Sequence, residues 1–199
     1  MFACSPRRLA VAAPMILAVC AAYAHAVQPG SRGPLYPLVI DNLGLSAAPL
    51  DGPWQFHLGD NPAWAEPAFD DSQWEQLTAD ETWGMQGHAN YAGYAWYRRK
   101  INLSAAPGAS PDFALLIPAI DGIYELYWNG MLVGRLGNMP PHMLVYSSVP
   151  AQTFGLGPVR SGVLAVRVFK LPLGTTDTGA GGGFEGTPIM GGTGAIAAA

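Results

Sequence analysis

The sequence predicts an all-β fold, an antiparallel β-sandwich with a few short helical turns. Apolar residues alternate with polar ones in short runs, as they do in strands that have one buried face. The chain has 25 Gly and 18 Pro among its 199 residues, and these turn-forming residues separate the runs at short intervals. Because 50% of the residues are hydrophobic, two sheets of this kind can bury a sizeable core between them.

Six runs are expected to form strands. They cover residues 52–58, 95–102, 112–118, 122–128, 131–136 and 163–169. Asn129-Gly130 stands between two of these runs and is typical of a two-residue type I′ hairpin, in which both central residues take a positive φ. Trp54 and Phe56 fall on one face of the first strand. We expect them in the core, because a buried Trp contributes a large apolar area.

Short helical turns are expected between the first two strands. Trp64, Phe69 and Trp74 are spaced to suit such turns. Asp70 or Asp71 can cap the turn that follows, since a carboxylate at this position accepts hydrogen bonds from free backbone N–H groups. Few other segments have a helical pattern, so the strands dominate the prediction.

The N-terminus has the features of an export signal. Residues 7–8 are both Arg, residues 9–23 are mostly apolar, and residues 24–26 read Ala-His-Ala, which fits the small-x-small cleavage rule. Both cysteines of the chain lie within residues 1–26, so we expect a mature chain without a disulfide or a thiolate metal site. The expected location is the periplasmic or extracellular face of a bacterial membrane.

The charge balance argues against a nucleic-acid partner. Cleavage at residue 26 removes two of the 10 basic residues and none of the 14 acidic ones, which leaves a formal net charge of −6. Proteins that bind nucleic acid usually carry a basic surface. We therefore expect no nucleic acid among the partners.

Composition divides the chain into four parts. Residues 1–26 are the signal peptide, and residues 27–49 form a lead-in segment rich in Pro, Gly and small residues. Residues 50–172 are the expected folded domain. Residues 173–199 are rich in Gly and Ala, a composition that buries little apolar surface. We expect this last part to be a linker or the approach to a missing domain.

The stretch 80–96 is the candidate ligand site. It is long, broken by Gly and without strand periodicity, and loops of this length in a compact domain are often functional. The candidate ligand-binding residues in and just after it are Trp83, His88, Asn90, Tyr91, Tyr94 and Arg98. On this hypothesis, Trp83→Ala weakens binding and leaves the fold intact. The alternative is an ordinary connection packed by Trp83 and Tyr94.

No catalytic residue, metal site or cofactor is predicted. Asp121 and Glu125 are four residues apart, which in a strand places them about 13 Å from each other, further than the carboxyl pairs of glycosidases. We expect Asp121 to pair with Arg98 or Arg99 instead. The histidines remaining after cleavage are His57, His88 and His142, and their spacing fits no known metal motif.

Three sequence blocks and a hairpin motif resemble those of a known family. They are Leu50-Asp51-Gly52-Pro53-Trp54-Gln55-Phe56, Phe69-Asp70-Asp71-Ser72-Gln73-Trp74 and Tyr94-Ala95-Trp96-Tyr97-Arg98-Arg99, with Asn129-Gly130 downstream. Over residues 50–170 the sequence resembles the N-terminal sugar-binding domain of family 2 glycoside hydrolases, which include β-galactosidases and β-glucuronidases. The resemblance implies a galactose-binding-domain-like jelly roll that helps to form a sugar site and carries no catalytic acid.

Two functions follow from the resemblance. The sequence also resembles the extracytoplasmic sensor regions of bacterial membrane signalling proteins, and the Gly/Ala-rich end departs from the immunoglobulin-like strand that follows in the hydrolases. We therefore expect a non-catalytic, exported sensory module that binds a saccharide or similar polyol and meets a membrane only through a missing C-terminal region. The alternative is the sugar-binding domain of a family 2 glycoside hydrolase whose catalytic barrel is absent from this chain.

Overall fold

The structure is a computed structural model that describes residues 30–43, 47–108, 112–146, 150–158, 161–172, 174 and 179–198. The predicted export signal at residues 1–26 lies outside these ranges, so the signal and the location that it implies stay predictions. Within the described ranges, no helix is long and apolar enough to cross a membrane.

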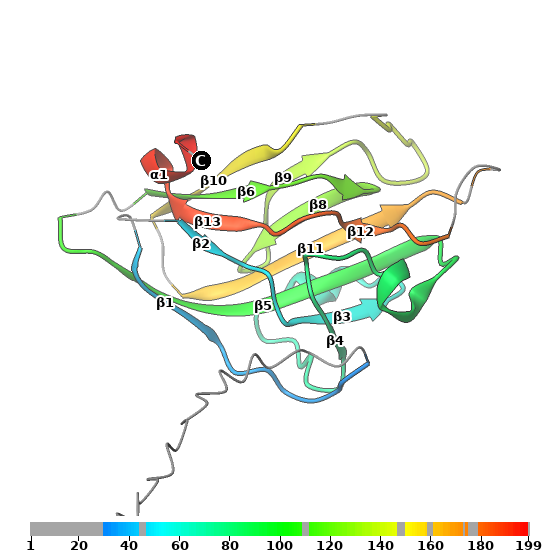
Figure 1. The fold of residues 1–199 in the computed structure, drawn as a ribbon, viewed down its shortest axis with the longest axis horizontal. Coiled ribbons are helices and arrows are strands. Elements are labelled where there is room, and N and C mark those ends of the chain that lie inside the picture. The colour runs from blue at the N-terminus through cyan, green and yellow to red at the C-terminus, as the bar shows by residue number, and fades with distance from the viewer. Residues whose placement is uncertain are drawn as a thin grey trace, which may run out of the picture.

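A seven-stranded sheet forms one layer of the fold (Figure 1). Its strands run in the order β4-β3-β5-β11-β8-β9, and β1 pairs in parallel with the C-terminal half of β5. All other pairs in this sheet are antiparallel. The strands are β1 (Leu38–Leu43), β3 (Trp54–Leu58), β4 (Glu75–Leu77), β5 (Gly93–Ala105), β8 (Ile123–Trp128), β9 (Met131–Leu136) and β11 (Gly162–Lys170).

A four-stranded antiparallel sheet forms the second layer, in the order β10-β6-β13-β2. Its strands are β2 (Ala47–Pro49), β6 (Asp112–Ile117), β10 (Gln152–Pro158) and β13 (Ile189–Gly192). A two-stranded ribbon pairs β7 (Ile120–Asp121) with β12 (Gly183–Phe184). The helical elements are single turns: the 3-10 turn η1 (Pro62–Ala65), the π-type turn η2 (Gly84–His88) and α1 (Thr193–Ala197). The predicted all-β sandwich with short helical turns is confirmed.

Each of the six predicted runs contains a strand of the structure, and the hairpin is also confirmed. Asn129 and Gly130 have φ values of 50° and 80°, and they join β8 to β9 as a tight antiparallel pair. Strand β10 is among the strands that were not predicted. Its residues are partly or fully exposed and none is buried, because it pairs at the edge of the smaller sheet.

The core lies between the two sheets. The larger sheet contributes Trp54, Phe56 and Tyr97, and the smaller sheet contributes Phe113 and Leu115, all 2% exposed or less. The Phe56 and Tyr97 ring centroids are 4.8 Å apart, within the usual range for packed aromatic pairs. Trp54 and Phe56 thus face the core, as predicted.

The folded unit extends beyond the predicted domain boundaries at both ends. β1 and β2, from the expected lead-in segment, pair with β5 and β13. Strand β13, from the expected linker, lies between β6 and β2 and is therefore central in the smaller sheet. Phe184 and Met190, both 0% exposed, belong to the main core. The folded unit therefore includes residues 38–43 and 183–197.

Close packing explains why the C-terminal segment is rich in Gly. A Cβ atom on Gly182 would lie 2.1 Å from Trp83 Cε2, and one on Gly183 would lie 2.1 Å from the Tyr97 hydroxyl oxygen. A Cβ on Gly84 would lie 2.4 Å from the Ala180 carbonyl carbon. Real Cβ contacts are not this short. Gly84 therefore allows its backbone to approach Ala180, and Gly182 and Gly183 allow theirs to approach the rings of Trp83 and Tyr97.

The close approach at Gly84 gives a direct stability test. Gly84 has no positive φ, so Gly84→Ala adds a methyl group without backbone strain. We expect it to destabilise the fold by about 1–3 kcal/mol, the usual cost of overpacking. Gly155→Ala is the matched control, because a Cβ there has no neighbour within 4 Å. Urea unfolding of both variants measures the difference, and equal stability would mean that residues 179–183 do not pack against η2.

Candidate functional site

The structure places Trp83 in the core and not on the surface. Its side chain is fully buried, with ring centroids 5.8 Å from Phe56 and 6.0 Å from Tyr91. The backbone N–H of Trp83 donates to the Gly182 carbonyl at 2.8 Å. The alternative, in which Trp83 packs the loop, describes the position of the ring, and a role of Trp83 in ligand binding stays a prediction.

Arg98 is also fully buried. Its Nε–H donates to Asp71 Oδ2 at 2.9 Å, and its guanidinium also donates to the carbonyls of Trp64 and Glu66. These groups lie on the outer face of the larger sheet, where the guanidinium carbon is 5.6 Å from the Phe69 ring centroid. The described environment gives Arg98 a structural role, and its predicted role as a donor to ligand hydroxyls stays a prediction without support from this geometry.

Asn90, Tyr91 and Tyr94 mainly hold the loop in place. The Tyr91 hydroxyl donates to the Tyr94 carbonyl at 2.7 Å, and the Asn90 backbone N–H donates to the Gly179 carbonyl at 2.8 Å. The Tyr94 ring packs under the Arg167 guanidinium, with 4.7 Å between its centroid and the guanidinium carbon. Their role in ligand binding stays a prediction without a shared cavity to support it.

His88 lines a shallow pocket of about 290 Å³ together with Trp74 and Glu75. Its Nε2 atom lies 2.8 Å from Glu75 Oε1. His88 is the only one of the six predicted site residues that lines this pocket. The six predicted residues are therefore close along the chain but do not converge on one cavity.

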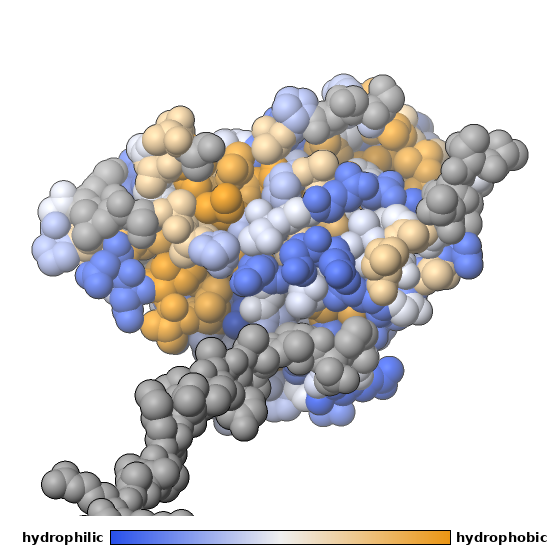
Figure 2. Space-filling model, viewed as in Figure 1, coloured by the Kyte–Doolittle hydropathy of each residue, from blue (hydrophilic) through white to orange (hydrophobic). Residues whose placement is uncertain are grey.

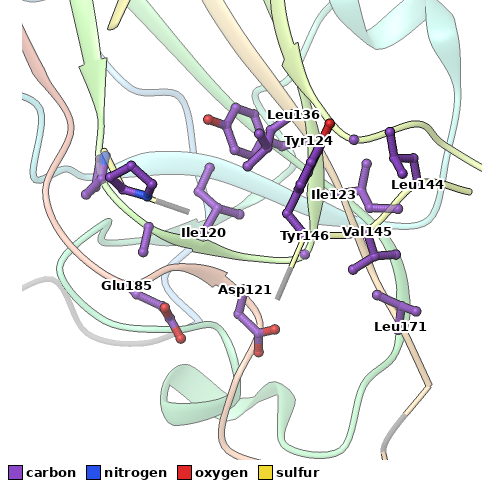
Figure 3. Close-up of a pocket in the computed structure, with 15 residues that line it drawn as sticks. Ile120, Asp121, Ile123, Tyr124, Leu136, Leu144, Val145, Tyr146, Leu171 and Glu185 are labelled. Carbon is purple, nitrogen blue, oxygen red and sulfur yellow. The ribbon is translucent and has the colours of Figure 1, made fainter. Parts of the chain in front are cut away.

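A larger pocket lies between the β6–β8 connection and the loop that follows β9 (Figure 3). Its volume is about 360 Å³. It is lined by Pro118, Ala119, Ile120, Asp121, Gly122, Ile123, Tyr124, Leu136, Gly137, Leu144, Val145, Tyr146, Pro150, Leu171 and Glu185. Figure 3 shows Asp121 and Glu185 on one side of the pocket and the apolar side chains of Leu144 and Val145 on the other. We call it the β8 pocket.

Three polar groups define the chemistry of the β8 pocket. Asp121 Oδ2 accepts a hydrogen bond from Lys170 Nζ at 2.6 Å, and the Asp121 side chain is 33% exposed. The prediction that Asp121 pairs with Arg98 or Arg99 is therefore wrong. Glu185 is exposed at the pocket. The Tyr124 hydroxyl is buried and has no hydrogen-bond partner among the described residues.

Burial raises the pKa of Tyr124 to about 12. The hydroxyl therefore keeps its proton near neutral pH and can donate a hydrogen bond. A buried polar group without a partner typically costs about 1–3 kcal/mol. A ligand oxygen that accepts from Tyr124 would recover part of that free energy.

The rim of the β8 pocket is apolar and accessible. Leu144, Val145 and Tyr146 are 45–53% exposed, and Figure 2 shows hydrophobic residues gathered around the loop that follows β9. Exposed rings beside polar groups are typical of small-molecule sites. The sequence shows no periodic signal for these residues, which follow Pro140-Pro141 outside any strand.

Two other carboxylates near the sheet, those of Asp60 and Glu125, are already paired. Arg167 donates to Asp60 at 2.6 and 2.8 Å and to Glu125 at 2.9 Å on the outer face of the larger sheet. Tyr127 also donates to Glu125, at 2.7 Å. This network stabilises the outer face and engages both Asp60 and Glu125. Within the described ranges, no group of His, Cys, Asp and Glu side chains could hold a metal ion.

The chain is similar in sequence to glycoside hydrolases. It is 29% identical over 96 residues to the β-galactosidase BoGH2A of Bacteroides ovatus, a match that covers 41% of this chain and 11% of that enzyme. The chain spans about a tenth of the length of the curated relatives that it matches. No model of a known protein family matches it.

Solved structures of family 2 glycoside hydrolases share the fold. The β-glucuronidase of Bacteroides uniformis superposes with a TM-score of 0.56 and 25% identity, over 73% of this chain and 18% of that enzyme. A family 2 member from Bacteroides cellulosilyticus superposes with a TM-score of 0.58 and 22% identity, over 73% of this chain and 20% of that chain. These comparisons support the glycoside hydrolase alternative better than the sensor.

The burial of Trp83 changes what its removal should do. Trp83→Ala should destabilise the fold by about 3–5 kcal/mol, as expected for a large buried aromatic residue. Met85→Ala, in the same turn but 65% exposed, should change stability by less than about 0.5 kcal/mol. Thermal and urea unfolding measure both. A Trp83→Ala protein as stable as the Met85→Ala protein would show that the ring is not in the core.

Proposed function

We propose that this chain is a non-catalytic β-sandwich domain of a family 2-like glycoside hydrolase, and that it binds a saccharide in the β8 pocket. The observation that carries the proposal is one pocket lined by two carboxylates, an exposed ring and Tyr124, whose buried hydroxyl has no partner among the described residues. The similarity to family 2 enzymes supports the saccharide class. The sandwich is the scaffold, and the hydrolytic machinery belongs to another part of the parent protein.

The polar groups of the pocket complement sugar hydroxyls. The partly exposed carboxylate of Asp121 and the exposed one of Glu185 accept hydrogen bonds, and charged acceptors form stronger hydrogen bonds than neutral ones. The Tyr124 hydroxyl donates. A sugar hydroxyl both donates and accepts, so sugar hydroxyls match both the carboxylate acceptors and the Tyr124 donor. Such contacts orient the ligand and give selectivity.

The apolar rim complements the other side of the sugar. A pyranose ring has a face of C–H groups, and Tyr146 offers an accessible aromatic ring at the mouth of the pocket. The pocket volume of about 360 Å³ falls within the size range of small-molecule sites. We therefore expect one sugar unit in the pocket and a Kd in the micromolar to millimolar range, about 4–8 kcal/mol of binding free energy.

Hydrolysis by the described residues is not expected. Glycoside hydrolysis uses two carboxyl groups on either side of the bond, one of them protonated. Asp121 forms an ion pair with Lys170, and Asp60 and Glu125 form ion pairs with Arg167. Each of these carboxylates accepts a hydrogen bond from its cationic partner, so none of the three stands in a free carboxyl pair. The chain should therefore bind 4-nitrophenyl glycosides without releasing 4-nitrophenol.

The binding test uses the full chain, calorimetry and amide chemical shifts. Methyl β-D-glucopyranoside and methyl β-D-galactopyranoside are the probes. We expect saturable shifts at residues 118–124 and 144–146. Tyr124→Phe should weaken binding about tenfold and leave the fold at least as stable, because it removes a buried hydroxyl that has no partner. Tyr146→Ala should weaken binding by a similar factor.

Tyr36→Ala is the matched control, since Tyr36 is 90% exposed and does not line the pocket. The affinity of the Tyr36→Ala chain for both methyl glycosides should equal that of the unmodified chain. A folded chain that shows no saturable shift with any saccharide at about 20 mM, well above the expected Kd, would contradict the proposal. So would binding that is unchanged in both Tyr124→Phe and Tyr146→Ala.

A further inference from the structure

The β8 pocket carries an unbalanced negative charge. Its described lining contains two carboxylates, Asp121 and Glu185, and no Lys, Arg or His. The one ammonium group near it belongs to Lys170, which pairs with Asp121. That pair is neutral as a unit, so Glu185 leaves the pocket with a net charge of −1.

Lys170 is held in a position from which it cannot serve a ligand. Its side chain is only 5% exposed, and its Nζ atom donates to Asp121 Oδ2 at 2.6 Å. The backbone at Gly181 covers the pair, because a Cβ atom there would lie 2.2 Å from Asp121 Oδ2 and 3.1 Å from Lys170 Nζ. The ammonium group is therefore covered, and the charged groups that line the pocket for a ligand are the carboxylates of Glu185 and Asp121.

We infer that the β8 pocket selects neutral or amino sugars and rejects uronic acids. The inference rests on the proposed function and assigns the ligand class of the same pocket. Like charges in a partly desolvated site repel strongly, because water screens them less there. A hydroxyl or ammonium group on the sugar instead gains a charge-assisted hydrogen bond to the carboxylates.

The ligand class follows from the charges of this pocket and not from the names of similar proteins. The Bacteroides uniformis structure is that of a β-glucuronidase, whereas the Bacteroides ovatus relative is a β-galactosidase. On the present chain, the two described carboxylates favour a neutral sugar over a uronic acid.

A neutral glucoside and two sugars that each differ from it at one group test the inference. Methyl β-D-glucopyranoside, methyl β-D-glucuronide and methyl 2-amino-2-deoxy-β-D-glucopyranoside are titrated into the full chain at pH 7 in about 20 mM salt. We expect the neutral glucoside to bind at least about tenfold more tightly than the glucuronide. Salt at about 0.5 M should narrow this ratio, because the Debye length falls well below 10 Å. The amino sugar should bind at least as tightly as the glucoside at low salt.

Glu185→Gln removes the unbalanced charge and keeps a similar shape. It should improve glucuronide binding about fivefold to tenfold relative to the glucoside. Glu81→Gln is the matched control, since Glu81 is also exposed but does not line the pocket. It makes the same change in net charge, and the ratio should stay at that of the unmodified chain. Amide chemical shifts of each variant verify the fold.

The outcomes separate the two proposals. Failure of all three sugars to bind would overturn the proposed function. Saturable glucoside binding together with equal glucuronide binding would overturn only the charge selectivity. A ratio of glucoside to glucuronide affinity that is unchanged both in Glu185→Gln and at high salt would also overturn the charge selectivity.

Discussion

The contact between the backbone of residues 182–183 and the rings of Trp83 and Tyr97 is the constraint on which the rest of the structure depends. Only residues without a Cβ atom fit there. The contact anchors β12 beside β7, and from there the chain enters β13 at the centre of the smaller sheet. The same path brings Glu185 to the β8 pocket. One close approach therefore completes the core and supplies a wall of the candidate site.

The strands could be predicted from the sequence because alternation and turn residues act locally. The hairpin at Asn129-Gly130 is the clearest case, since its two positive φ values depend on those two residues alone. The C-terminal boundary could not be predicted in this way. A Gly-rich segment has the composition of a linker, whereas here Gly182 and Gly183 are required by rings about 85 and 100 residues earlier in the chain. Long-range packing of this kind leaves no local pattern.

The candidate site shows the same limit. The Gly-broken loop was expected to expose its aromatic residues, but Trp83 packs in the core instead, since burying a large ring stabilises the fold. The β8 pocket joins Asp121, Tyr146 and Glu185, which are far apart in sequence and share no motif. Its charge balance depends on the pairing of Asp121 with Lys170, which spacing could not indicate. Fold similarity to family 2 glycoside hydrolases supports the ligand class, and the side chains determine its charge.

The central claim is that residues 183–192 belong to the sandwich and form part of the site. Hydrogen–deuterium exchange of the full chain tests it most directly. Met190 pairs with Leu115 of β6 and with Ala48 of β2. Its amide should therefore exchange about as slowly as that of Tyr97 in β5, in the globally protected class. Exchange of residues 183–192 within seconds, as in a solvated linker, would contradict the account.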